Sequence, residues 1–306
     1  MLYEIASAPL RPPIDRFARS FLEVSSGHPI DFTQPIGEPA VVPAESLSWV
    51  IFKNPITLFI GGVAGVLLEL AEPRVRDGVW QNTSFRSDPL DRLKRTGMAA
   101  MVTVYGPKSR AEAMIAGVVR MHERVIGETS DGEPYRASDP ELLDWVQATA
   151  GFGFMEAWHR FVRPLDRGER DRLLREAQPA ARLYGAIGAP SSQAALDDLF
   201  DDHRGTLVAS PIVGEFLQIM RKVPAFPGPA HPLQRMLLKA AIDILPGWVR
   251  RRIGLDGEQK LTIGEGLTVR AAAATMERLV LPSLPAVQAC RRLGLPDDYL
   301  YRGARG

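Results

Sequence analysis

Polar side chains at helical spacing mark residues 89–105, a segment predicted to be a helix. Arg92, Thr96, Ala99 and Thr103 are three or four residues apart, so they form one stripe along it. Beyond the first turns the flanking positions are almost all apolar, which predicts burial on most sides. A buried guanidinium requires an anionic partner, either a carboxylate or a ligand. The partner could be the carboxylate of Glu69, Glu72 or Asp88, or an anionic ligand; the alternative is that Arg92 and the adjacent Arg95 are both solvated at the start of the helix.

A histidine occupies a core position of the next predicted helix, over residues 110–126. His122 shares the inward stripe of that helix with apolar residues, namely Ala111, Ile115, Val118 and Val125. A neutral imidazole in such a place can ligate iron or zinc when an acceptor on its other nitrogen orients the ring. A metal or haem site is therefore the functional hypothesis, and a histidine satisfied by a neighbouring group is the alternative.

A second metal pattern lies on the predicted helix over residues 139–163. Glu156 and His159 have the Glu-x-x-His spacing of ferritin-like di-iron bundles, which places both side chains on one face. Such a bundle needs a second copy and two further carboxylates. The chain has no second copy, and Glu69 and Glu72 are the nearest carboxylate donors. A di-iron enzyme is therefore the weaker alternative.

Composition and the absence of other motifs exclude several function classes. A net charge of +1 over 306 residues gives no long-range field for nucleic acid or an anionic membrane. The single cysteine, Cys290, rules out an intramolecular disulfide and a cysteine-based zinc site. The chain contains no Gly-x-Ser-x-Gly elbow, phosphate-binding loop or His-Glu-x-x-His motif.

Hydropathy gives an expectation about membranes and compartment. The start of the chain lacks the apolar core of a signal peptide, and the run Pro55–Leu68 is too short to span a bilayer. We therefore expect a cytoplasmic protein with no stable membrane insertion.

Helical periodicity dominates, so the sequence predicts an all-α protein. The longer predicted helices are Trp49–Ala71, Pro89–Tyr105, Arg110–Ile126, Asp139–Arg163 and Arg167–Ala177. Shorter ones are predicted at Gln193–Leu207, Pro211–Arg221, Leu233–Ile244 and Val269–Leu279. Several starts follow from N-cap patterns: Asp88 before Pro89, and the pairs Ser109/Glu112, Ser138/Glu141 and Asp166/Glu169.

We expect a single large helical domain with three parts. Residues 1–46, rich in proline and glycine, are predicted to be an arm with a short helix near Asp15–Glu23. Residues 47–250 would form the helical core, and residues 251–306 a C-terminal helical extension packed on that core.

Four segments carry a family resemblance over roughly residues 47–250. They read GGVAGVLLELAEPRVRDGV, FRSDPLDRLKRTGMAAMVTVYG, VVRMHERVIG and YRASDPELLDWVQAT. Each is modest by itself, and together, in this order and spacing, they are fairly specific. The sequence resembles the oxygenase family that includes the fungal MpaB oxygenase and the bacterial latex-clearing proteins, which are rubber oxygenases.

The resemblance implies an all-α fold with a globin-like core that holds haem b. The segment Val-Arg-Met-His matches the family's Arg-x-x-His ligand segment with its spacing shortened by one, which makes His122 the implied iron ligand. Latex-clearing members place Arg, Lys and Thr at i, i+3 and i+4 on the distal side. These positions are Arg92, Arg95 and Thr96 here, so an arginine replaces the lysine. Because arginine is always charged and ligates iron poorly, the resemblance implies a distal side that is open to dioxygen or differently gated.

Other positions depart from the family. Many members have Ala-His-Pro where this chain has Ala71-Glu72-Pro73, and Glu-His-Ser where it has Gln81-Asn82-Thr83. Gln147 replaces the histidine of the Trp-Val-His-Ala-Thr segment found in relatives. The centre of the family site is thus kept while histidines around it are replaced.

The resemblance implies a haem b-dependent oxygenase that uses dioxygen on a small apolar, isoprenoid-type substrate. It would cleave a carbon–carbon double bond oxidatively, with Arg92, Arg95 and Thr96 as catalytic residues. Haem would be held by His122, its metal ligand, together with Arg92, Thr96 and Thr103. A non-catalytic haem- or lipid-binding protein of the same fold and the di-iron enzyme are the alternatives.

Overall fold

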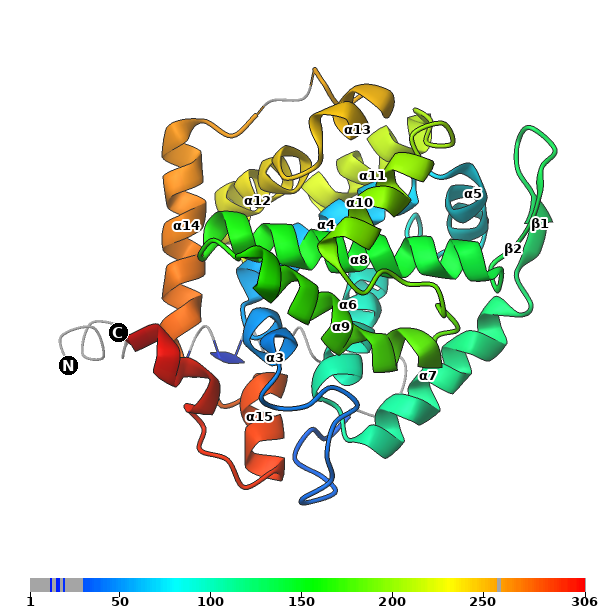
Figure 1. Ribbon diagram of the computed structural model, residues 1–306. Coiled ribbons are helices and arrows are strands. Elements are labelled where there is room, and N and C mark those ends of the chain that lie inside the picture. Colours follow the sequence, from blue (N-terminus) through cyan, green and yellow to red (C-terminus); the bar gives the residue numbers. More distant parts are fainter. Residues whose placement is uncertain (1–11, 13–14, 17–18, 20–29, 258–259, 306) are drawn as a thin grey trace.

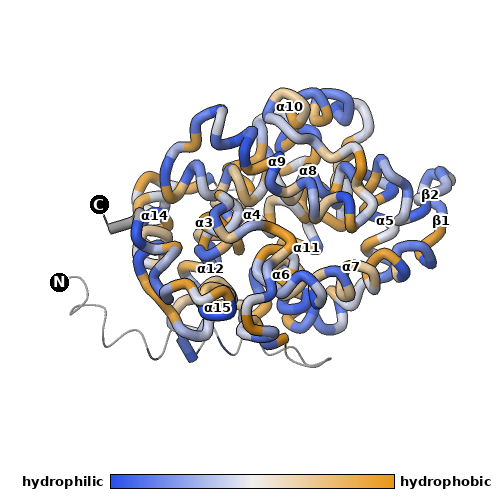
Figure 2. The backbone as a smooth tube through the Cα atoms, turned by 60° about the horizontal axis from the view of Figure 1, so that its bottom comes forward, coloured by the Kyte–Doolittle hydropathy of each residue, from blue (hydrophilic) through white to orange (hydrophobic). Residues whose placement is uncertain are grey.

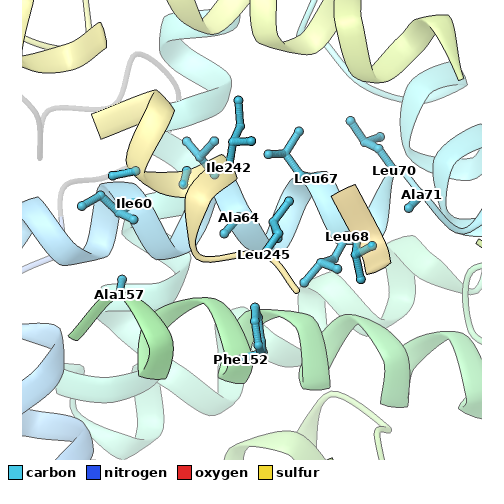
Figure 3. Close-up of a cluster of buried hydrophobic side chains, with 14 of the residues drawn as sticks. Ile60, Ala64, Leu67, Leu68, Leu70, Ala71, Phe152, Ala157, Ile242 and Leu245 are labelled. Carbon is cyan, nitrogen blue, oxygen red and sulfur yellow. The ribbon is translucent and has the colours of Figure 1, made fainter. Parts of the chain in front are cut away.

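Two long antiparallel helices cross at the centre of the molecule, α4 (Pro55–Glu69) and α8 (Pro140–Phe161) (Figure 1). A Cβ atom on Gly61 would lie 2.7 Å from the carbonyl oxygen of Gly153, and one on Gly65 would lie 3.3 Å from that of Thr149. The backbones therefore touch, and no side chain fits between them at Gly61 and Gly153. Figure 3 shows apolar side chains of both helices around this crossing, with Ile242 and Leu245 covering it.

The computed structural model describes residues 12, 15–16, 19, 30–257 and 260–305. Most of these residues are helical, which confirms the all-α fold class. Around α4 and α8 lie α3 (Leu47–Phe52), α5 (Pro73–Gln81), α6 (Pro89–Tyr105), α7 (Lys108–His122), α9 (Arg167–Leu183), α10 (Gln193–Asp202), α11 (Pro211–Lys222), η2 (Gly228–Ala230), α12 (His231–Asp243), α13 (Gly247–Arg252), α14 (Ile263–Arg278), α15 (Pro285–Arg292) and η3 (Tyr299–Arg305). Figure 2 shows hydrophobic and hydrophilic residues alternating along most helices, as expected of amphipathic helices around a core.

Some helix starts follow from local capping. Helix α6 begins after Asp88, whose carboxylate accepts a hydrogen bond of 3.2 Å from the Asp91 amide, and it has the predicted bounds. Helix α9 has the predicted capping box, in which Asp166 and Glu169 accept hydrogen bonds from each other's amides. These starts depend only on neighbouring residues, so a local pattern predicts them.

Three other local predictions are wrong. The single helix predicted over Trp49–Ala71 is broken, because Asn54 caps α4 and Pro55 is its first residue. Neither Ser109 nor Ser138 forms a capping box. At α7 the cap comes from elsewhere in the chain: the carboxylate of Glu38 accepts hydrogen bonds from the Ser109 amide and hydroxyl, at 2.6 and 3.1 Å.

Helix α7 ends four residues earlier than predicted, so His122 is its last residue rather than a mid-helix one. The chain then forms a hairpin that the periodicity did not indicate, β1 (Ile126–Glu128) paired antiparallel with β2 (Pro134–Arg136). The hairpin is fastened to α5, since Asp77 accepts a hydrogen bond of 3.0 Å from the Ser130 amide. The position of His122 is thus constrained from both sides.

The end of α6 belongs to a second hydrophobic cluster, separate from the one around α4 and α8. It combines Val102 and Tyr105 of α6 with residues from both ends of the described chain, among them Phe32, Val42, Val287 and Cys290. The arm and the extension expected from sequence therefore pack on the same helix. The three-part division itself stays a prediction, and the predicted helix near Asp15–Glu23 lies largely outside the described residues.

Among the described helices, none is by itself long and apolar enough to cross a bilayer. The pair α4 and α5 meets that length and composition test together, but it is bent by 109°.

Candidate functional site

Helices α6 and α7 form a hairpin whose arms diverge from a tight turn at Gly106–Pro107 (Figure 1). Arg92 lies fourteen residues before Gly106 and His122 fifteen residues after Pro107, so both lie near the open end. The charge of Arg92 is close enough to lower the pKa of the His122 imidazole. The two groups that the sequence singled out therefore lie within electrostatic range of each other.

His122 is half-buried and incompletely satisfied. Its Nδ1 atom is buried and has no hydrogen-bond partner within the described residues. Burial is the main cause of its lowered pKa, and the charge of Arg92 adds to the effect. The ring is therefore neutral at pH 7, which is the form that ligates a metal.

Arg92 is half-buried as well, and within the described residues its side chain makes no hydrogen bond or ion pair. Burial is the main cause of its lowered pKa and Arg95 adds repulsion, while Glu69 acts in the opposite direction. An enclosed guanidinium without a partner is costly, so this one is suited to an anionic group that the protein itself does not supply.

Glu69, at the end of α4, is the carboxylate whose charge affects the pKa of Arg92. Burial raises its pKa to about 7, and Arg92 partly opposes the shift. The side chain nevertheless keeps some accessible surface. A carboxyl group that protein surrounds and yet leaves partly open can exchange a proton near neutral pH.

Glu72, the other carboxylate considered from sequence, is committed to structure. It caps α5 by accepting a hydrogen bond of 2.8 Å from the Val75 amide, and Arg74 donates to it at 3.0 Å. Of the two carboxylates, only Glu69 interacts with Arg92.

Arg95 and Thr96 lie on the same turns of α6 but are more exposed. The Arg95 side chain is 43% exposed, and its Nε lies 3.3 Å from the Asp91 carboxylate. Thr96 donates to the Arg92 carbonyl at 2.9 Å. No contact within the described residues joins either side chain to His122, so their predicted roles stay predictions.

Thr103 connects the stripe to a residue that the sequence analysis missed. Its hydroxyl donates to the Ala99 carbonyl at 2.8 Å and lies 3.0 Å from the hydroxyl of Tyr184, which follows α9. Eighty-one residues separate the pair along the chain. No local pattern could reveal this contact.

The two residues of the predicted di-iron pattern interact with other parts of the protein. Glu156 forms an ion pair with Arg170, and His159 Nδ1 accepts a hydrogen bond of 2.9 Å from the Leu165 amide. Within the described ranges, no three His, Cys, Asp or Glu side chains are grouped as metal ligands. These contacts account for Glu156 and His159 as parts of the structure.

Two side chains near the open end of the α6–α7 hairpin have the chemistry that haem b would require of its partners. The unpartnered imidazole nitrogen of His122 is a donor of the type that holds haem iron. The unpartnered guanidinium of Arg92 can pair with a carboxylate of the kind that haem carries. This fit depends on groups that the protein leaves unsatisfied.

A comparison with protein-family models finds one match. The model is described as the catalytic domain of the ER-bound oxygenase mpaB/B' and rubber oxygenase, and it covers residues 49–278. No curated protein and no solved structure matches the chain. The globin-like part of the fold expectation therefore stays a prediction.

Proposed function

This chain belongs to the mpaB and rubber oxygenase family, and from that premise we propose that it is a haem b-dependent oxygenase. Its substrate is an apolar molecule of the isoprenoid class, cleaved at a carbon–carbon double bond. One double bond and one dioxygen molecule yield two carbonyl groups, so the overall reaction needs no further reductant. The observation that supports the proposal is a half-buried, neutral imidazole at His122, whose buried Nδ1 has no partner within the described residues, in electrostatic range of the Arg92 guanidinium.

His122 would hold the haem iron, and Arg92 would pair with a haem carboxylate or with a polar group of the reactants. The bound haem would supply the centre at which dioxygen is activated. Thr96 and Arg95 sit one turn along α6, where they can bind and orient polar groups. Both side chains are exposed, so protein packing does not hold them in place.

Glu69 would move the proton. Its pKa of about 7 lets it accept a proton from the substrate and return it at neutral pH. The positive charge of Arg92 stabilises the ionised form, which is the form that acts as a base.

The test is an absorption spectrum of the purified protein, before and after reconstitution with haem. We expect a Soret band that is lost in His122→Ala and kept in the matched control His231→Ala, because His231 is exposed at the start of α12. Protein that stays haem-free after reconstitution would overturn the proposal.

Dioxygen consumption separates catalysis from simple binding. With a prenyl substrate, haem-loaded protein is expected to consume dioxygen, and Glu69→Gln to do so at least tenfold more slowly because the base is lost. Tight haem binding with no dioxygen consumption on any prenyl substrate would instead favour a non-catalytic haem- or lipid-binding protein.

A further inference from the structure

The pair Thr103–Tyr184 has a defined hydrogen-bond direction. Thr103 has one hydroxyl proton and donates it to the Ala99 carbonyl at 2.8 Å, since a carbonyl can only accept. In the 3.0 Å contact between the two hydroxyls, Tyr184 must therefore be the donor. The phenol proton is committed to Thr103.

The phenol oxygen keeps an unused acceptor site. Within the described residues no group donates a hydrogen bond to Tyr184. The side chain is half-buried, and burial raises the pKa of the phenol. An enclosed oxygen that can accept but cannot donate selects for a ligand with a donor, such as a hydroxyl, and against an ether or a ketone.

Tyr184 lies at the far end of the stripe that begins at Arg92. With a rise of about 1.5 Å per residue, Thr103 is about 10 Å along α6 from Thr96 and about 16 Å from Arg92. Between Thr96 and Thr103, the only residue on this stripe is Ala99, whose side chain is small and apolar. The polar groups at the two ends of the stripe are therefore separated by an apolar surface without bulky side chains. An elongated apolar molecule with one hydroxyl end matches this pattern.

The residues beside Tyr184 are apolar and exposed. Leu183 is 37% exposed, and Ile187, two residues beyond Gly185, is 72% exposed. Gly185 has a φ of +89°, which ends α9 and turns the chain there. The chain close to Tyr184 thus carries exposed apolar side chains that a prenyl group could cover.

We propose that Tyr184 is a specificity-determining residue that accepts a hydrogen bond from the hydroxyl of an isoprenoid alcohol. The chain of that alcohol lies along α6, with its remote double bond towards Arg92. The inference rests on the proposed function for the substrate's isoprenoid class. It adds that the substrate has an alcohol end rather than being a pure hydrocarbon.

The test compares the binding of farnesol and farnesyl methyl ether by titration calorimetry, with haem-free and haem-loaded protein. These probes differ in the donor proton and one methyl group. Wild-type protein is expected to bind the alcohol about three to ten times more tightly, as one neutral hydrogen bond allows. Tyr184→Phe is expected to reduce the ratio to about one, because the acceptor is gone.

A second variant tests the hydrogen-bond direction without touching Tyr184. Thr103→Val releases the phenol proton, which can then be donated to the ether oxygen, so the ratio should also fall. Thr103→Ser retains the acceptor and should rescue the preference. In the control Tyr135→Phe the ratio should not change, because that phenol lies on the hairpin and contacts Gln81.

A wild-type ratio of one, which a bound water at Tyr184 would give, overturns this proposal. So does a preference that survives in Tyr184→Phe, or one that persists in Thr103→Val. These outcomes are independent of haem: a missing Soret band with an intact alcohol preference overturns the oxygenase assignment alone. A Soret band with no preference overturns the role of Tyr184 alone.

Discussion

Two arginine side chains that are removed from solvent, one fully and one partly, differ in whether they have hydrogen-bond partners. Arg292 on α15 is 1% exposed and donates three hydrogen bonds of 2.7 to 2.8 Å, to the carbonyls of Phe32, Glu38 and Tyr105. Arg92 on α6 is half-buried, and its guanidinium makes no hydrogen bond or ion pair within the described residues. Arg292 joins the arm, the end of α6 and the C-terminal segment, whereas Arg92 joins nothing.

This difference between the two arginines distinguishes residues that stabilise the fold from residues that are available to bind a ligand. Satisfied buried groups specify how segments pack, and removing one leaves several partners unpaired. Unsatisfied groups reduce stability and are kept where a ligand completes them. The region around Arg292 is therefore expected to control stability, and the region around Arg92 and His122 to control cofactor binding.

The largest effect is expected from Arg292→Met. It leaves three buried carbonyls without their donor, so the free energy of unfolding should fall by about 4 kcal/mol. Urea unfolding measures the change. The neighbouring Arg291→Met serves as the control; it breaks an exposed pair with Asp297 and should cost less than about 1 kcal/mol. Equal effects of the two variants would contradict the assigned role of Arg292.

A slightly smaller effect is expected at Lys53 and Glu277, a second satisfied cluster. Their ion pair is buried, Asn54 donates to Glu277 at 3.1 Å, and burial lowers the pKa of Lys53 to about 7. Either Lys53→Met or Glu277→Leu alone should cost about 3 kcal/mol because it strands the other charge. The double variant should recover most of that loss, and additive losses in a double-mutant cycle would show that the pair does not interact.

The unsatisfied region should respond to pH through Glu69. Its folded-state pKa of about 7 is above the ordinary 4.5, so the folded state binds this proton more tightly. The contribution of this proton to the free energy of unfolding is complete below about pH 4.5, and it is lost as the pH rises through 7. Glu69→Gln should therefore be more stable than wild type at pH 8, by about 1 to 3 kcal/mol, and equal to it at pH 4. Haem-free protein unfolded in urea across this range gives the comparison, and the exposed Glu128→Gln should run parallel to wild type.

The smallest expected change in stability has the opposite sign to the first. Arg92→Met replaces an unpartnered guanidinium with an apolar side chain, so haem-free protein should gain about 1 kcal/mol. The same variant should bind haem at least tenfold more weakly, which titration monitored at the Soret band measures. A loss of stability of the size expected for Arg292→Met would mean that Arg92 is a structural residue too.

Local residue patterns predicted much of the helical framework. The bounds of α6 were correct because Asp88, Pro89 and Gly106 act on their immediate neighbours. The break before α4 was missed although Asn54–Pro55 is itself a local N-cap signal. The cap of α7 was not predictable in this way, because it comes from Glu38, seventy-one residues away.

The candidate site, like the helical framework, could be predicted from the sequence only in part. Helical spacing predicted Arg92, Thr96 and Thr103 on one stripe and His122 in the core of the next helix, and the resemblance of the family segments implied roles that stay predictions. Helical spacing could not show whether the side chains of these residues have hydrogen-bond or ion-pair partners. Glu72 and Glu69 look equivalent in sequence, yet one caps a helix and the other faces Arg92.

The sequence by itself therefore determined the helical class, most of the helices and the family, and it predicted which residues lie at the centre of the candidate site. Those features depend on short-range periodicity, capping and motif order. Only the tertiary structure decided that the Arg292 side chain is satisfied and the Arg92 side chain is not, that Glu156 pairs with Arg170, and that the hydroxyls of Tyr184 and Thr103 meet. The physical reason is that a polar group's role depends on which partners reach it, and the partners here come from distant parts of the chain.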